Sequence, residues 1–110
     1  PKSYPITLTI TVLFGLFQQL FLLNYHSWLT RKKGVPFPSD MDLMRHIRAN
    51  NLYAVKELKA NVSRWDNRRV FAILGLLREY DAKSKGLDSG GLDGGELLKE
   101  LLLKIFIQRA

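Results

Sequence analysis

The sequence predicts an all-α protein, a single bundle of about five helices. Apolar residues recur three and four positions apart in two long segments, as they do along one face of an α-helix. No segment alternates polar and apolar residues over a useful length. Thr7–Val12 comes nearest, but it continues unbroken into a longer helical pattern. The 110 residues suit one domain with one hydrophobic core.

The first predicted helix contains an uncharged stretch of eighteen residues, Ile6 to Leu23. Pro5 suits the first turn, and Thr30-Arg31 is expected at the end. At ~1.5 Å per residue the stretch would cross barely one bilayer core. A helical wheel gathers Thr7, Thr11, Gly15 and Gln18 on one side, and the other side holds Ile6, Ile10, Leu13, Phe14, Phe17 and Phe21. We therefore favour a helix packed among others, and a membrane-anchored protein stays as an alternative.

Two short helices are expected after a loop. The glycine and prolines of Lys32–Pro38 predict the loop. Ser39 reads as the N-cap of a helix that runs through Met44 and Ile47, with aspartates in its first turn. Asn50-Asn51 is expected to break this helix. The apolar spacing of Leu52–Lys59 predicts the next one.

The last two helices carry the clearest apolar stripes. Asp66 is the expected N-cap of the fourth helix, whose stripe is Val70, Ile73, Leu74, Leu77 and Tyr80. Gly86 is expected to end it in a left-handed conformation. Leu87–Gly95 has four glycines and reads as a flexible loop, with Asp93 capping the fifth helix. That helix has the stripe Leu97, Leu98, Leu101, Leu102 and Ile105, with Lys99, Glu100 and Lys104 expected to face solvent.

The residue types present argue against most catalytic chemistry. The chain has no cysteine, which excludes disulfides and thiolate metal sites and favours a cytoplasmic location. His26 and His46, the two histidines, lie twenty positions apart without a Glu or Cys at metal-ligand spacing. The glycines of 90–95 lack the lysine of a phosphate-binding loop. We expect no catalytic, cofactor-binding or metal-binding residue, and therefore no enzyme.

The net charge is strongly positive. Seventeen basic residues against ten acidic ones give +7 and a pI near 9.9. A nucleic-acid-binding domain, or a module attached to one, has this electrostatic character. The basic residues are spread over several helices, as on solvated faces, with Arg31-Lys32-Lys33 as the densest group. A stand-alone basic helical domain that binds DNA is therefore a second alternative.

Arg78, Asp81 and Lys85 form a local constellation in the fourth helix. Spacings of three and four residues allow all three to meet along one helix edge, as a surface ladder of ion pairs. They also belong to the segment REYDAKSKG (78–86), which is followed after the glycine-rich loop by GELLKEL (95–101). Together these segments resemble the carboxyl-terminal domain of the bacterial DNA polymerase III delta subunit. The likeness covers nearly the whole chain, although the specific motifs lie in the last sixty residues.

The resemblance implies a definite role. The delta subunit belongs to the clamp loader, which opens the ring-shaped sliding clamp and places it on primed DNA during replication by the DNA polymerase III holoenzyme. Its carboxyl-terminal helical domain packs beside those of the other subunits to form a circular collar. The expected partners of this chain are therefore the other clamp-loader subunits. Contacts with DNA and with the clamp would belong to AAA+-like modules upstream of Pro1, because the chain reads as a piece of a longer protein.

A collar domain needs apolar surface for its neighbours. Phe71 lies off the main stripe of the fourth helix, and Leu103 and Ile107 lie off that of the fifth. We interpret these three positions as exposed side chains in subunit contacts. The alternative interpretation is that they extend the core of this domain.

Overall fold

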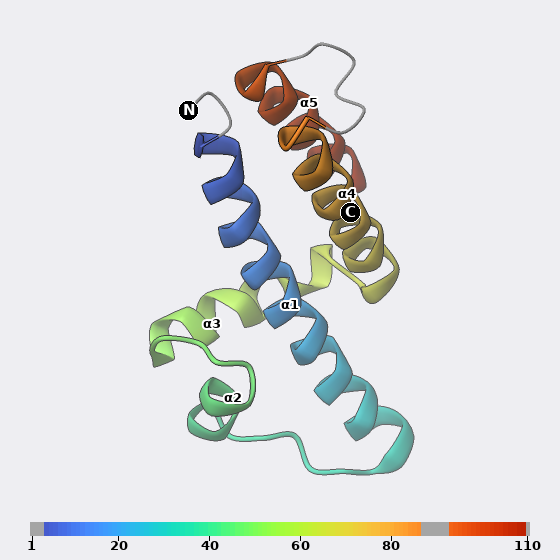
Figure 1. Cartoon of the computed structure of the whole chain (residues 1–110). Helices are drawn as coiled ribbons and strands as arrows, with labels where there is room; N and C mark the ends of the chain where they lie inside the picture. Colours follow the sequence, from blue (N-terminus) through green and yellow to red (C-terminus); the bar gives the residue numbers. More distant parts are fainter. Residues whose placement is uncertain (1–3, 87–92, 110) are drawn as a thin grey trace.

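The chain folds into five α-helices and one 3-10 turn, in a computed structural model that describes residues 4–86 and 93–109 (Figure 1). The elements are α1 Tyr4–Lys33, α2 Asp40–His46, α3 Leu52–Asn61, η1 Val62–Arg64, α4 Asn67–Ser84 and α5 Gly94–Gln108. No strand occurs within these residues. The all-α prediction, with about five helices, is confirmed.

The helices form an elongated molecule of 50 × 25 × 19 Å around the long helix α1. Helices α1, α4 and α5 pack against one another, and α2 packs on α3, which crosses α1 near its middle (Figure 1). Helix α1 continues past the ends of α4 and α5 (Figure 1).

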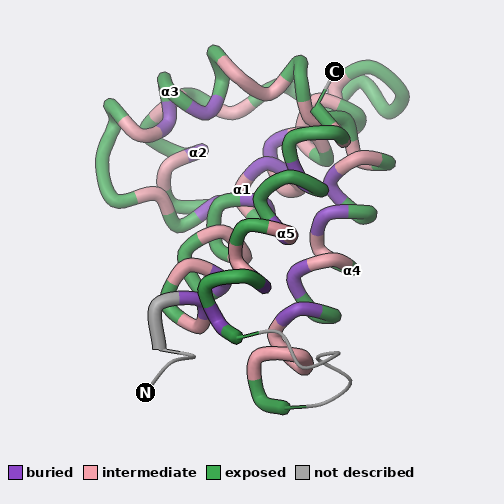
Figure 2. The backbone as a smooth tube through the Cα atoms, turned by 90° about the horizontal axis from the view of Figure 1, so that it is seen from above, coloured by how far each residue is buried: buried purple, intermediate pink, exposed green. Residues whose placement is uncertain are grey.

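The core is drawn from all five helices, and its buried residues follow the inner side of each (Figure 2). The members are Ile6, Ile10, Phe17, Leu20, Leu23, Leu43, Ile47, Val55, Leu58, Val70, Ile73, Leu77, Tyr80, Leu97, Leu101 and Ile105. The predicted stripe of the fourth helix is confirmed, with Leu74 half-buried. The stripe of the fifth is wrong at Leu102, whose side chain is 45% exposed.

Side-chain caps set where the helices begin, as the sequence predicts at three positions. Ser39, Asp66 and Asp93 each accept a hydrogen bond from the backbone N–H three residues later, over 3.2, 2.9 and 2.9 Å. Asn51, which we predicted only as a break, caps α3 through the N–H of Ala54 at 2.8 Å. Gly86 has the expected positive φ of 90°.

Two predicted boundaries are wrong. Helix α1 runs to Lys33, beyond the expected end at Thr30-Arg31, and the Thr30 hydroxyl donates a 3.2 Å bond to the His26 carbonyl within the helix. The three basic residues of its last turn suit the negative end of the helix dipole. Helix α5 begins at Gly94, inside the predicted loop Leu87–Gly95. Residues 87–92 of that loop lie outside the described residues.

Helix α1 is long and apolar enough to cross a membrane, judged by length and composition alone. Only 28% of its most apolar stretch is buried in the fold. A core helix passes the same test, and α1 contributes five residues to the core, from Ile6 to Leu23. The predicted polar side of the wheel is confirmed at Thr11, Gly15 and Gln18, which are exposed.

Candidate protein interface

The outer side of α5 is a contiguous apolar surface. Its members, which we call the outer α5 face, are Leu102, Leu103, Phe106 and Ile107, and they are 45% to 69% exposed. The opposite side of the same helix supplies Leu97, Leu101 and Ile105 to the core. A helix at the edge of a fold usually exposes polar residues, and one that is apolar all round is usually covered. This face therefore has the composition of a protein–protein contact.

The three positions predicted for subunit contacts are all exposed, but they do not lie together. Leu103 and Ile107 are one turn apart on α5 and adjoin each other. Phe71 is 59% exposed on α4, where its ring lies 5.2 Å from that of Phe21 on α1. Phe71 thus belongs to the seam between α1 and α4. None of the three extends the core of this chain.

Phe106 was not predicted as exposed, and the assignment of Leu102 to the core is wrong. Both lie off the ridge formed by Leu101 and Ile105, because each residue turns an α-helix by about 100°. Leu102 directly follows the buried Leu101, and successive residues of a helix do not share a face. A full helical wheel of α5 would have found both positions.

The predicted ladder in the fourth helix forms only in part. The ammonium group of Lys85 lies 3.0 Å from the Asp81 carboxylate. Arg78 makes no ion pair with any residue that the structure describes and instead lines a shallow hollow beside α1, with Phe14 and Gln18. Exposed pairs of this kind stabilise a fold only slightly. The ladder alone therefore gives the segment no function.

The two segments that carry the resemblance meet in space. The buried Tyr80 of REYDAKSKG donates its hydroxyl hydrogen to the Oε1 atom of Glu100 in GELLKEL. The Nζ atoms of Lys83 and Lys104 lie 4.7 and 5.2 Å from the centre of the Tyr80 ring. A hydrogen bond to Glu79 raises the pKa of Lys83. Glu100 was expected to face solvent, but this bond makes it part of the joint between α4 and α5.

The two histidines also meet, although they lie twenty positions apart in the sequence. The rings of His26 and His46 stack with centres 5.3 Å apart and planes 15° from parallel. Burial, together with the charge that His46 can carry, lowers the pKa of His26. No group of three or more His, Cys, Asp or Glu among the described residues could hold a metal ion. His26 lies within α1 and not at its end.

The carboxyl-terminal end of α1 combines aromatic and basic groups. The exposed rings of Tyr25 and Trp28 stack with centres 6.2 Å apart, and the Lys33 ammonium group lies 5.8 Å from the Trp28 ring centre. Arg31 and Lys32 follow in the same last turn. Proteins that bind single-stranded nucleic acids combine aromatic rings, on which the bases stack, with cations that contact the phosphates.

Comparisons with models of protein families, with curated proteins and with solved structures find no match for this chain.

Proposed function

We propose that this chain is a protein–protein assembly domain, the collar domain of a bacterial clamp-loader delta subunit. The observation that carries the proposal is the outer α5 face, four apolar side chains that the fold leaves exposed. A fully buried Leu, Ile or Phe side chain contributes about 1.5–3 kcal/mol relative to an exposed one. A neighbouring subunit that covers this face would therefore be bound by several such contributions.

The joint between Tyr80 and Glu100 supports the same proposal. This hydrogen bond fixes the position of α5 on α4. Its two residues come from REYDAKSKG and GELLKEL, the segments that carry the resemblance. A rigid support of this kind presents the outer α5 face in one orientation, which lowers the entropy lost when a partner binds. The role needs no catalytic group in this chain. Contacts of other delta-subunit modules with DNA and with the sliding clamp, and the cytoplasmic location, are parts of the same proposal.

A pull-down of this chain with the other subunits of a bacterial clamp loader tests the proposal. We expect the chain to retain at least one of them. The double variant Leu103→Lys/Ile107→Lys should weaken that association roughly a hundredfold, since it places two charges in the contact. Ala60→Lys/Asn50→Lys is the matched control, because it adds the same charge at exposed positions near α2 and α3. Retention of no subunit, with helicity intact by circular dichroism, would reject the proposal.

The aromatic and basic end of α1 favours a second candidate function, direct binding of nucleic acid. Tyr25, Trp28 and Lys33 would then contact bases and phosphates. The observable is the affinity of this chain for DNA as a function of salt concentration, because the slope reports the number of phosphates that are neutralised. A steep slope that Lys33→Ala reduces, together with an affinity that Trp28→Ala lowers without a change of slope, supports this function. A flat slope rejects it and leaves the assembly role in place.

A further inference from the structure

Part of the outer α5 face continues toward α1, on the flank of α5 that faces away from α4. Glu100 and Lys104 face α4, where both contact Tyr80. Helical spacing puts Leu102 and Phe106 on the other flank, toward α1, against which α5 also packs. Both side chains are exposed there.

The matching flank of α1 is found in the same way. Phe14 and Gln18 face α4, since they line the hollow beside Arg78. Val12 and Leu16 therefore lie on the opposite flank, the side on which α5 packs, and both are exposed. We call Val12, Leu16, Leu102 and Phe106 the α1–α5 strip.

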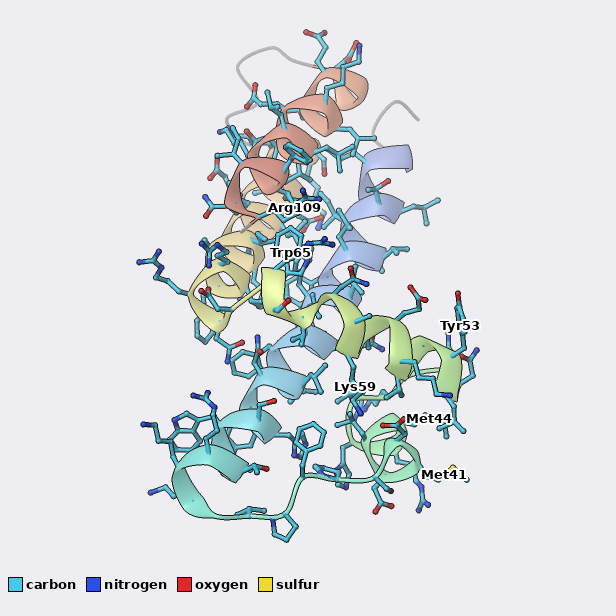
Figure 3. The ribbon with its side chains drawn as sticks, turned by 180° about the vertical axis from the view of Figure 1, so that it is seen from behind. Met41, Met44, Tyr53, Lys59, Trp65 and Arg109 are labelled. Carbon is cyan, nitrogen blue, oxygen red and sulfur yellow. The ribbon has the colours of Figure 1, made fainter. Side chains whose placement is uncertain are left out.

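The strip opens at one end into a hollow. Leu16 belongs to the strip and also lines a hollow of about 480 Å³ between α1 and α3. The other apolar residues around this hollow are Leu20, Tyr53, Ala54, Leu58 and Trp65. Helix α3 crosses in front of α1 in Figure 3, where Trp65 and Tyr53 are labelled. The hollow is large enough to take an apolar side chain that projects from a partner.

A basic residue lies at each end of the α1–α5 strip. Lys99 precedes Leu102 by three residues and Arg109 follows Phe106 by three, so all four positions share one flank of α5. The Arg109 guanidinium lies 5.2 Å from the centre of the Phe106 ring. Within the described residues neither cation has an acidic partner, and Glu57 is the one acidic residue around the hollow. At ~1.5 Å per residue the two cations are about 15 Å apart along the helix.

We propose that the α1–α5 strip and the hollow bind an amphipathic helix of a partner protein, with acidic residues about three turns apart beside its apolar face. Carboxylates at that spacing would pair with Lys99 and Arg109, while an apolar side chain enters the hollow beside Trp65. The proposal rests on the assembly role proposed above and specifies the chemistry of the partner. It concerns the flank of α5 that bears Leu102 and Phe106. Ile107 lines a separate hollow beside α4, together with Arg68, Arg69 and Arg109.

A second copy of the chain fits this surface less well. It would bring Lys99 and Arg109 of one molecule against the same cations of the other, and like charges across an interface oppose association. A membrane rich in anionic lipid would satisfy the charges. The hollow, however, is recessed between two helices, a shape that suits a projecting side chain better than a lipid surface.

A synthetic peptide tests the proposal. The probe is a fluorescein-labelled helical peptide of about 16 residues, with leucines along one face and two glutamates about ten positions apart; a second peptide has lysines in place of the glutamates. Fluorescence anisotropy gives the affinity of each for the 110-residue chain. We expect the acidic peptide to bind at least about tenfold more tightly than the basic one, and Lys99→Glu/Arg109→Glu to reverse this order. Lys32→Glu/Lys56→Glu is the matched control for net charge and should preserve the order.

Three results would overturn the proposal. The first is equal affinity for the two peptides. The second is an affinity that Lys99→Glu/Arg109→Glu leaves unchanged. The third is association with phosphatidylglycerol vesicles in the absence of peptide binding, which would make the surface a lipid contact.

The two proposals fail in different ways. Retention of clamp-loader subunits that Lys99→Glu/Arg109→Glu does not weaken would reject the acidic helix and keep the assembly role. Binding of the acidic peptide with the expected reversal, without retention of any subunit, would reject the clamp-loader role and keep the strip as a helix-binding surface.

Discussion

At the scale of single residues, helix caps and contacts between pairs of side chains stabilise this fold. The caps at Ser39, Asp66 and Asp93 could be predicted because the side chain and the N–H that it accepts from are three residues apart. The pair His26 and His46 could not be predicted, since the rings come from different helices. Their stacking joins α1 to α2, and burial lowers the pKa of His26.

The histidine pair predicts a pH-dependent stability. The folded chain holds the pKa of His26 below its ordinary value of 6.5, so the unfolded chain binds more protons as the pH falls through 6.5. The free energy of unfolding should therefore fall from pH 7 toward pH 5, as measured by urea denaturation. His26→Gln should flatten this dependence. His46→Gln should flatten it only in part, because it removes the neighbouring charge but leaves the burial of His26. A slope identical in all three proteins would contradict the interpretation.

The helices differ in how far sequence patterns predict their faces. The stripe of α4 is correct, since Val70, Ile73, Leu77 and Tyr80 follow helical spacing and are all buried. In α5, Leu101, Leu102 and Leu103 are consecutive, so residue type alone does not separate the core from the surface, and the assignment of Leu102 to the core is wrong. The bond between Tyr80 and Glu100 was also missed, since it joins two helices twenty residues apart.

Neighbouring leucines of α5 test the assignment of its faces. Leu101→Ala removes a fully buried side chain and should lower the free energy of unfolding by about 2–5 kcal/mol. Leu102→Ala changes an exposed side chain and should alter it by about 0.5 kcal/mol or less. Thermal or urea denaturation of the two variants makes the comparison at adjacent positions of one helix. Equal losses would mean that α5 is rotated relative to the structure described here.

The whole molecule is held together by α1, which contacts α3, α4 and α5. The all-α class followed from composition and periodicity, and the helix order from local signals. The side-by-side packing of α1, α4 and α5 and the hollow at Trp65 depend on contacts between distant segments, which no local pattern encodes. The surface left exposed by this packing could be predicted only in part, at Phe71, Leu103 and Ile107.

The role of α1 can be tested on the whole chain. If α1 is a core helix, the 110-residue chain should fold in detergent-free buffer, with a radius of gyration by small-angle scattering close to the Cα value of 15.8 Å plus a hydration layer. Leu20→Asp should then abolish the cooperative thermal transition, because it places a charge in the core. A requirement for detergent, together with insensitivity to Leu20→Asp, would instead indicate that α1 lies in a membrane.

Photo-cross-linking from the outer α5 face tests the central claim most directly. Leu103→p-benzoylphenylalanine places a reactive ring at an exposed position, and the same substitution at Ala60 is the control. In the presence of the other clamp-loader subunits, irradiation should link the position 103 variant covalently to one of them, while the position 60 variant stays free. A complex that forms without a cross-link at position 103, but with one at position 60, would contradict the claim that a partner protein covers α5.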